Sequence, residues 1–170
     1  MREHFVGRTP RLTGYLCGIT LGLACLVAGA EATRLVLVGS LSTPAFVGYV
    51  AIGAVSGLFL SFVTGYLNGS ILASWLAGFV PAAGRLGKPL ADGLLFEAGL
   101  TLVGALGAGI MLGTVGFVIA VEKHRWDART ASLPDPASRG DLLVLVIISG
   151  ALGGALFATP ALSYAISSGL

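Results

Sequence analysis

Hydrophobic and charged positions occupy separate long blocks of this chain. Fifty consecutive residues, from Leu35 to Gly84, contain no Asp, Glu, Lys, Arg or His. As one straight helix this run would be about 75 Å long, whereas the hydrocarbon core of a bilayer is about 30 Å thick. The run must therefore cross a membrane, turn and re-enter it. Further apolar runs of transmembrane length cover residues 12–30, 98–121 and 142–170.

This pattern predicts an all-α fold, a small polytopic bundle of about five transmembrane helices that forms one membrane domain over residues 1–170. Ser42-Thr43-Pro44 predicts a helix start and Asn68-Gly69 a tight reversal. The expected spans cover residues 12–32, 44–66, 70–84, 93–121 and 142–166, and a hydrophilic loop covers 122–141, with Asp141 as the expected N-cap of the last span. The third segment is short, so four crossings plus a re-entrant or interfacial segment is the alternative.

The first apolar run has two interpretations. It follows three arginines and ends in Ala28-Gly29-Ala30, which resembles a signal-peptidase site. Its 19 apolar residues exceed the 7–15 that are usual for a signal peptide. We expect a retained first span, and cleavage of a signal peptide stays an alternative.

The distribution of basic residues predicts the orientation. Five spans with a cytoplasmic N-terminus place seven basic residues inside and three outside, whereas four spans give five on each side. The inner set is Arg2, Arg8, Arg11, Lys123, Arg125, Arg129 and Arg139, and the outer set is Arg34, Arg85 and Lys88. We therefore expect five spans in the cell membrane, with the N-terminus and the 122–141 loop in the cytoplasm. Eight arginines against two lysines are typical of a GC-rich prokaryotic genome.

Small residues spaced by four are the main candidates for helix packing. Glycine at this spacing lets helix backbones approach closely within a membrane. The candidate packing positions are Gly14, Gly18, Gly22, Gly53, Gly57, Ser61, Gly65, Gly150 and Gly154, and the series that begins at Gly53 continues through Gly69, Ala73 and Ala77. We expect contacts within the chain, and the alternative is a seam between copies of the chain or with other membrane subunits.

Apart from Glu31, which marks the far end of the first span, Glu97 is the only acidic residue inside an expected span. On a helix it shares a face with Thr101, so the two residues are candidates for an ion path. Glu97 lies only one turn from the expected helix start, where it could instead reach the interface or pair with Arg85 or Lys88.

The sequence also lacks the motifs of several common enzyme classes. It holds no G-x-S-x-G, H-E-x-x-H or phosphate-loop motif, and His4 and His124 have no metal-ligand spacing. We therefore expect no catalytic residue, cofactor or metal, and the net charge of +2 gives no reason to expect nucleic acid. The leading hypothesis is a non-enzymatic structural or accessory subunit in the lipid bilayer. The alternative is a small ion or solute transporter or channel subunit that uses Glu97.

Overall fold

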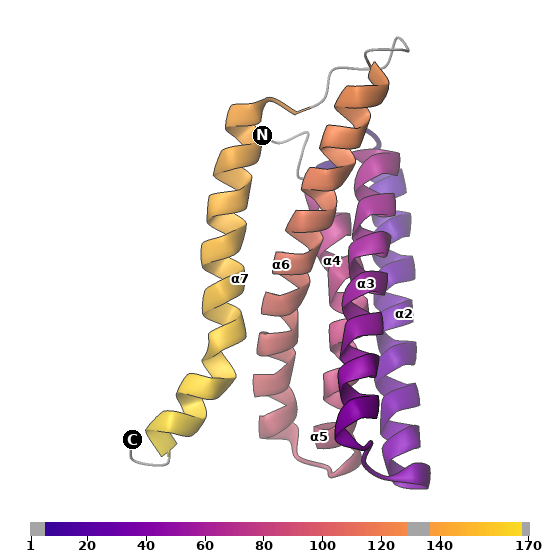
Figure 1. Ribbon diagram of the computed structural model, residues 1–170, viewed down its shortest axis with the longest axis vertical. Helices are drawn as coiled ribbons and strands as arrows, with labels where there is room; N and C mark the ends of the chain where they lie inside the picture. Colours follow the sequence, from indigo (N-terminus) through magenta and orange to yellow (C-terminus); the bar gives the residue numbers. More distant parts are fainter. Residues whose placement is uncertain (1–5, 129–136, 168–170) are drawn as a thin grey trace.

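A computed structural model describes residues 6–128 and 137–167, and within these ranges the regular structure is helical, with no strand (Figure 1). The elements in chain order are α2 (Pro10–Val38), α3 (Thr43–Asn68), α4 (Ile71–Ala82), the 3-10 turn η1 (Ala83–Leu86), α5 (Gly87–Ala91), α6 (Leu95–Ala128) and α7 (Arg139–Ser167). The predicted all-α bundle is confirmed.

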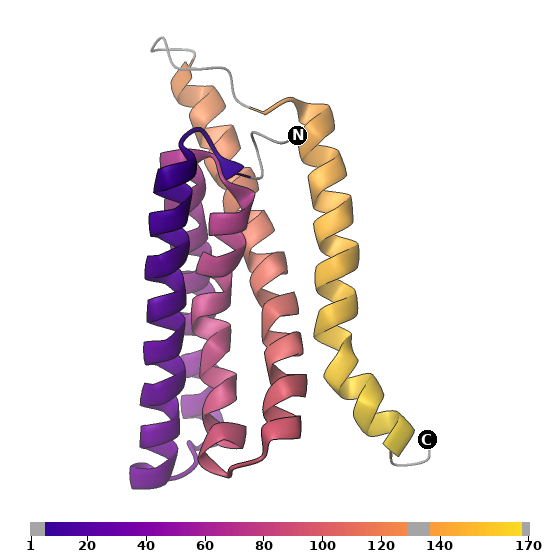
Figure 2. The ribbon, with the colours of Figure 1, turned by 180° about the vertical axis from the view of Figure 1, so that it is seen from behind.

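Successive elements run in alternate directions along the bundle. The chain descends in α2, returns in α3, descends through α4 to α5, returns in α6 and descends in α7 (Figures 1 and 2). The start of α2, the end of α6 and the start of α7 therefore lie at one end, called here the N-terminal end. The end of α7 lies at the opposite end of the bundle.

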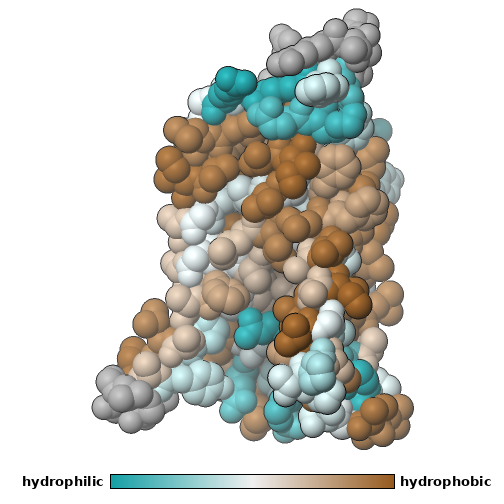
Figure 3. Space-filling view, viewed as in Figure 1, coloured by the Kyte–Doolittle hydropathy of each residue, from teal (hydrophilic) through white to brown (hydrophobic). Residues whose placement is uncertain are grey.

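Four helices, α2, α3, α6 and α7, are long and apolar enough to cross a membrane. Apolar side chains such as Val36, Ile52 and Leu95 are exposed on them, as expected where lipid replaces water. Figure 3 shows hydrophilic residues gathered at the N-terminal end and hydrophobic residues along the flank below it. The molecule is therefore an integral membrane protein in contact with a lipid bilayer.

The short helix α4 occupies the middle of the bundle, packed against α2, α3 and α6. Most of its 12 residues are buried, including Ala73, Ala77 and Gly78. Small side chains on α4 let three neighbours approach it, because little volume separates the backbones. The expected short third segment is thus a core helix, which continues through η1 and α5 to the far end.

Two connections are more helical than the sequence indicates. The polar stretch after α4 forms η1 and α5, and α6 continues through residues 122–128 of the expected loop; residues 129–136 lie outside the described residues. The N-cap of α7 is Ser138, whose hydroxyl accepts from the amide of Asp141 at 3.1 Å. Asp141 lies in the first turn instead, where a negative charge is favoured by the helix dipole.

Candidate functional site

Glycines of α4 and α6 bring these two helices into close contact. A methyl group added at Gly78 would lie 2.6 Å from the carbonyl oxygen of Gly109, and one added at Gly113 would lie 2.5 Å from the carbonyl oxygen of Ser74. Both distances are shorter than any real carbon contact, so the two backbones are in direct contact. The α4–α6 interface therefore has no room for side chains at these positions.

The candidate packing residues of α3 also face the interior. Gly57, Ser61 and Gly65 are buried, and a methyl group at Gly57 would lie 2.8 Å from Cγ of Pro81 in α4. Gly53 lies at ordinary contact distance from the same proline, 3.4 Å. Gly69 interrupts this series in the left-handed conformation, with φ of 65°. The turn at Gly69 places the second half of the series, in α4, against the first half in α3.

The candidate glycines of α2 and α7 are placed differently. Gly14, Gly18 and Gly22 have no described atom within 4 Å of an added methyl group, and the same holds for Gly150 and Gly154. They lie on outward faces of their helices. On α7 the neighbouring Gly153 makes the contact instead, 2.9 Å from Cγ of Met111 in α6.

Glu97 lies in the first turn of α6, at the end of the bundle opposite the N-terminal end, and its side chain is exposed. Thr101, one turn further, is half-buried. Lys88 bonds Asp92 at 2.6 Å, and this bond, with a weaker contribution from Glu97, raises the pKa of Lys88. Glu97 is thus exposed at one end of the bundle, and the described residues do not enclose it between helices.

A network of buried hydroxyl groups joins α3 to α4. The hydroxyl of Ser61 donates to the carbonyl oxygen of Ser74 at 2.9 Å, and that of Ser74 donates to the carbonyl oxygen of Ser61 at 3.1 Å. Trp75 donates from Nε1 to the hydroxyl of Thr114 in α6, also at 2.9 Å. These polar side chains are satisfied by the bundle itself, as burial in a membrane requires.

Asn68, the last residue of α3, binds the N-terminal segment, residues 6–9. Its carbonyl oxygen accepts from the amide of Arg8 at 2.8 Å and its Oδ1 from the amide of Thr9 at 3.0 Å. Its Nδ2 donates to the hydroxyl of Thr13 at 2.6 Å. Gly7 fits against Asn68 only because it has no side chain and adopts φ of 74°. The sequence predicted Asn68 only as a turn residue. Its contacts with the N-terminal segment could be seen only in the fold.

Charged side chains surround this segment at the N-terminal end. Arg8 Nη2 lies 2.7 Å from Nε2 of His124, a residue of α6 that is 5% exposed. The ring of Tyr66 packs edge-on against the imidazole, with the ring centres 5.8 Å apart. Tyr66 donates to Asp127 at 2.8 Å, and Asp127 also bonds Lys123. This is the densest polar cluster of the described residues.

The opposite end has a simpler ion pair. Arg34 donates two hydrogen bonds to Glu31, at 2.9 and 2.6 Å, and a third to the carbonyl oxygen of Gly39. Together they fix the end of α2 to the turn that begins the return in α3. The charges of Arg34 and Glu31 therefore neutralise one another at the C-terminal end of α2.

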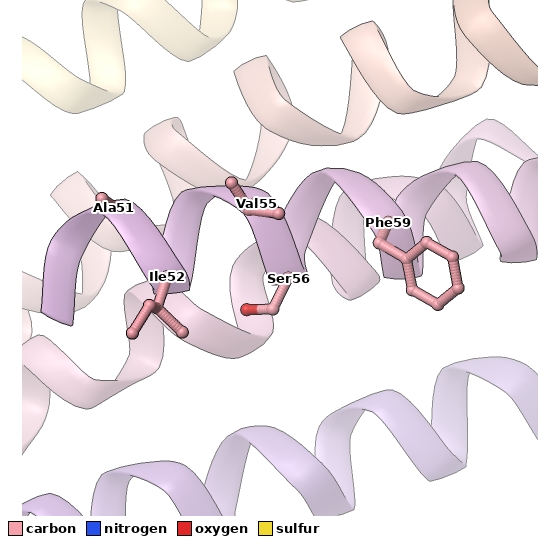
Figure 4. A pocket seen from close by; sticks show the side chains of 5 residues that line it. All are labelled: Ala51, Ile52, Val55, Ser56 and Phe59. Carbon is pink, nitrogen blue, oxygen red and sulfur yellow. The ribbon is translucent and has the colours of Figure 1, made fainter. Parts of the chain in front are cut away.

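A shallow apolar depression of about 500 Å³ lies on the outer face of α3. It is lined by Ala51, Ile52, Val55, Ser56 and Phe59 (Figure 4). All five belong to one helix, and no set of polar groups converges there, which distinguishes it from a ligand pocket. It has the character of a lipid-facing surface.

Within residues 6–128 and 137–167, no cluster of three or more His, Cys, Asp or Glu side chains has the geometry to hold a metal ion. No protein-family model, curated protein or solved structure matches this chain. Its function must therefore be inferred from the bundle itself.

Proposed function

We propose that this protein is a non-enzymatic structural or accessory subunit of a membrane assembly. The contrast between two sets of glycines carries the proposal. The buried glycines of α3, α4 and the inner face of α6 lie against neighbouring helices, whereas Gly14, Gly18 and Gly22 face open space. In a membrane, outward glycines at this spacing favour packing against a second helix over contact with acyl chains, because they let two helix backbones approach closely.

The surroundings of α2 and α7 support the same proposal. α2 packs on α4, η1 and α5 and makes little contact with α3, and α7 packs against α6. One stripe of α7 is buried, at Leu142, Leu145, Ser149 and Gly153. Each outer helix thus leaves most of its circumference to lipid or to a partner helix.

The position of Glu97 favours a structural role over the ion-path alternative. An intramembrane acid that binds and releases a cation is expected to face the bundle interior or a water-filled cavity. Glu97 is exposed at the bundle end, and the buried hydroxyls of Ser61 and Ser74 are bonded to backbone carbonyls. A polar path for ions would need hydroxyl groups that are free to bind them. The buried hydroxyls of Ser61 and Ser74 instead bond carbonyl oxygens of the neighbouring helix.

The test is the mass of the native particle. Membranes are extracted directly into polymer-bounded lipid discs, and the mass of the protein component is measured. We expect a component larger than one 17.2 kDa chain, and we expect Gly18→Ile to reduce it to a single chain with unchanged helical content. A wild-type particle that holds one chain alone contradicts the proposal.

A further inference from the structure

The N-terminal segment is held on the bundle by two residues distant in sequence. Asn68 binds the amides of Arg8 and Thr9, and His124 binds the Arg8 side chain. Arg8 Nη2 bonds a ring nitrogen of His124, and among the residues that the structure describes no carboxylate pairs with Arg8. The Arg8–His124 contact therefore depends on the protonation state of one imidazole.

A guanidinium group can only donate hydrogen bonds. At a separation of 2.7 Å, Nε2 of His124 must be the acceptor and must lack a proton. Nδ1 then carries the ring hydrogen, and this atom is buried without a hydrogen-bond partner among the described residues. The observed arrangement thus requires the neutral form of His124.

We propose that Arg8 and His124 form a pH-sensitive latch that fastens the N-terminal segment to α6 and opens when His124 takes up a proton. A proton on Nε2 removes the lone pair that accepts from Arg8. It also places a second positive charge beside the guanidinium, in a site where burial weakens screening by water. Histidine is the side chain that ordinarily changes charge between pH 5 and 8.

The other groups around His124 direct this change toward the Arg8 contact. From α6 come Lys123 and Asp127, which bond one another, and from α3 comes Tyr66, which bonds Asp127. The charge of Asp127 attracts an imidazolium, whereas Arg8 repels it. Protonation therefore favours the interaction of His124 with its own helix and weakens its interaction with the N-terminal segment.

The amides of Arg8 and Thr9 provide the readout, since both are bonded to Asn68 while the segment is docked. Hydrogen exchange of the full chain in lipid discs is followed by mass spectrometry at pH 7.5 and 5.5, after correction for the intrinsic exchange rates. We expect protection of the peptide that covers residues 6–13 to fall as pH is lowered. A one-proton switch gives up to about tenfold per pH unit. A peptide from residues 31–41, at the opposite end, should not change.

Two variants separate the latch from a general effect of acid. His124→Gln keeps an oxygen that can accept from Arg8 but cannot be protonated, so protection should be equal at both pH values. Arg8→Gln removes the cation that an imidazolium would repel, and protection should again be independent of pH. Arg8 is exposed, so its replacement should leave the bundle folded.

Equal protection of the wild type at both pH values, or an unchanged pH response in either variant, would overturn the latch. The outcome does not depend on whether the protein assembles with others.

Discussion

Ser61 and Ser74 each donate a hydroxyl hydrogen bond to the backbone carbonyl of the other, at 2.9 and 3.1 Å. The two serines belong to α3 and α4 and are 0% exposed. Each hydroxyl also lies within bonding distance of a carbonyl in its own helix, Gly57 or Ser70. The pair thus connects two backbones that a side chain larger than serine would separate.

Removal of this pair should reveal a coupling between the two helices. Buried hydrogen bonds between transmembrane helices contribute about 0.6 kcal/mol on average. We expect Ser61→Ala and Ser74→Ala each to destabilise the bundle by about this amount. The double variant should lose less than the sum, because either substitution loosens the α3–α4 contact that holds the remaining hydroxyl at its carbonyl acceptor. Unfolding in mixed micelles measures all three variants, and strict additivity would show that the two hydroxyls act independently.

The α4–α6 contact should tolerate little added volume. A methyl group at Gly113 meets the backbone of Ser74 and Trp75. We therefore expect Gly113→Ala to destabilise the protein by about 1–3 kcal/mol, the range for overpacked interiors. Gly150→Ala in α7 is the matched control, since its new methyl group meets no described atom. A loss of thermal stability in the control as large as that in Gly113→Ala would contradict the packing described here.

The sequence predicted the membrane class and much of the helical layout, and the reasons are local. Leu35 to Gly84 has no charged residue and exceeds one membrane thickness. Asn68-Gly69 is typical of a tight turn that reverses the chain direction, and Gly69 adopts the left-handed conformation. Both features act within one stretch of chain, so they can be recognised without knowledge of the neighbours.

The central position of α4 could not be predicted in the same way. In a membrane protein, apolar residues face lipid and core alike, so hydropathy does not distinguish a buried helix from an outer one. The same limit applies to glycines: Gly18 and Gly57 have equivalent spacing, yet one faces outward and the other contacts Pro81. Arg8 and His124 are 116 positions apart, and only the alternating path of the helices brings them together.

Glu97→Gln should have little effect if the residue is an interfacial acid. The side chain is exposed, so loss of its charge should change stability by less than about 0.5 kcal/mol. Insertion and thermal unfolding of the variant are compared with the wild type, and proton, sodium and potassium flux is measured in liposomes. Cation flux in the wild type that Glu97→Gln abolishes would favour the transport alternative.

The orientation of the bundle can be tested from both ends. Described basic residues at the N-terminal end outnumber acids: Arg8, Arg11, Lys123, Arg125 and Arg139 against Glu122, Asp127 and Asp141. At the opposite end the numbers are equal: Arg34, Arg85 and Lys88 against Glu31, Asp92 and Glu97. We therefore expect the N-terminal end to be cytoplasmic.

Single cysteines report this orientation in a background that lacks Cys17 and Cys25. Ser40→Cys, in the connection between α2 and α3, should react with an impermeant thiol reagent in intact cells. Ser132→Cys, between α6 and α7 in the sequence, should react only after the membrane is permeabilised. The reverse pattern would invert the proposed topology.

The most direct test of an assembly through α2 uses Cys25, which is exposed and lies one turn beyond Gly22. In a Cys17→Ala variant, Cys25 is labelled with a benzophenone maleimide in native membranes and irradiated. We expect a covalent product heavier than one chain, and we expect Gly18→Ile to abolish it. The matched control places the label at Val55→Cys, on the outer face of α3, in a chain without Cys17 and Cys25. No more product from Cys25 than from this control would show that the glycine face of α2 meets lipid and would contradict the proposed subunit role.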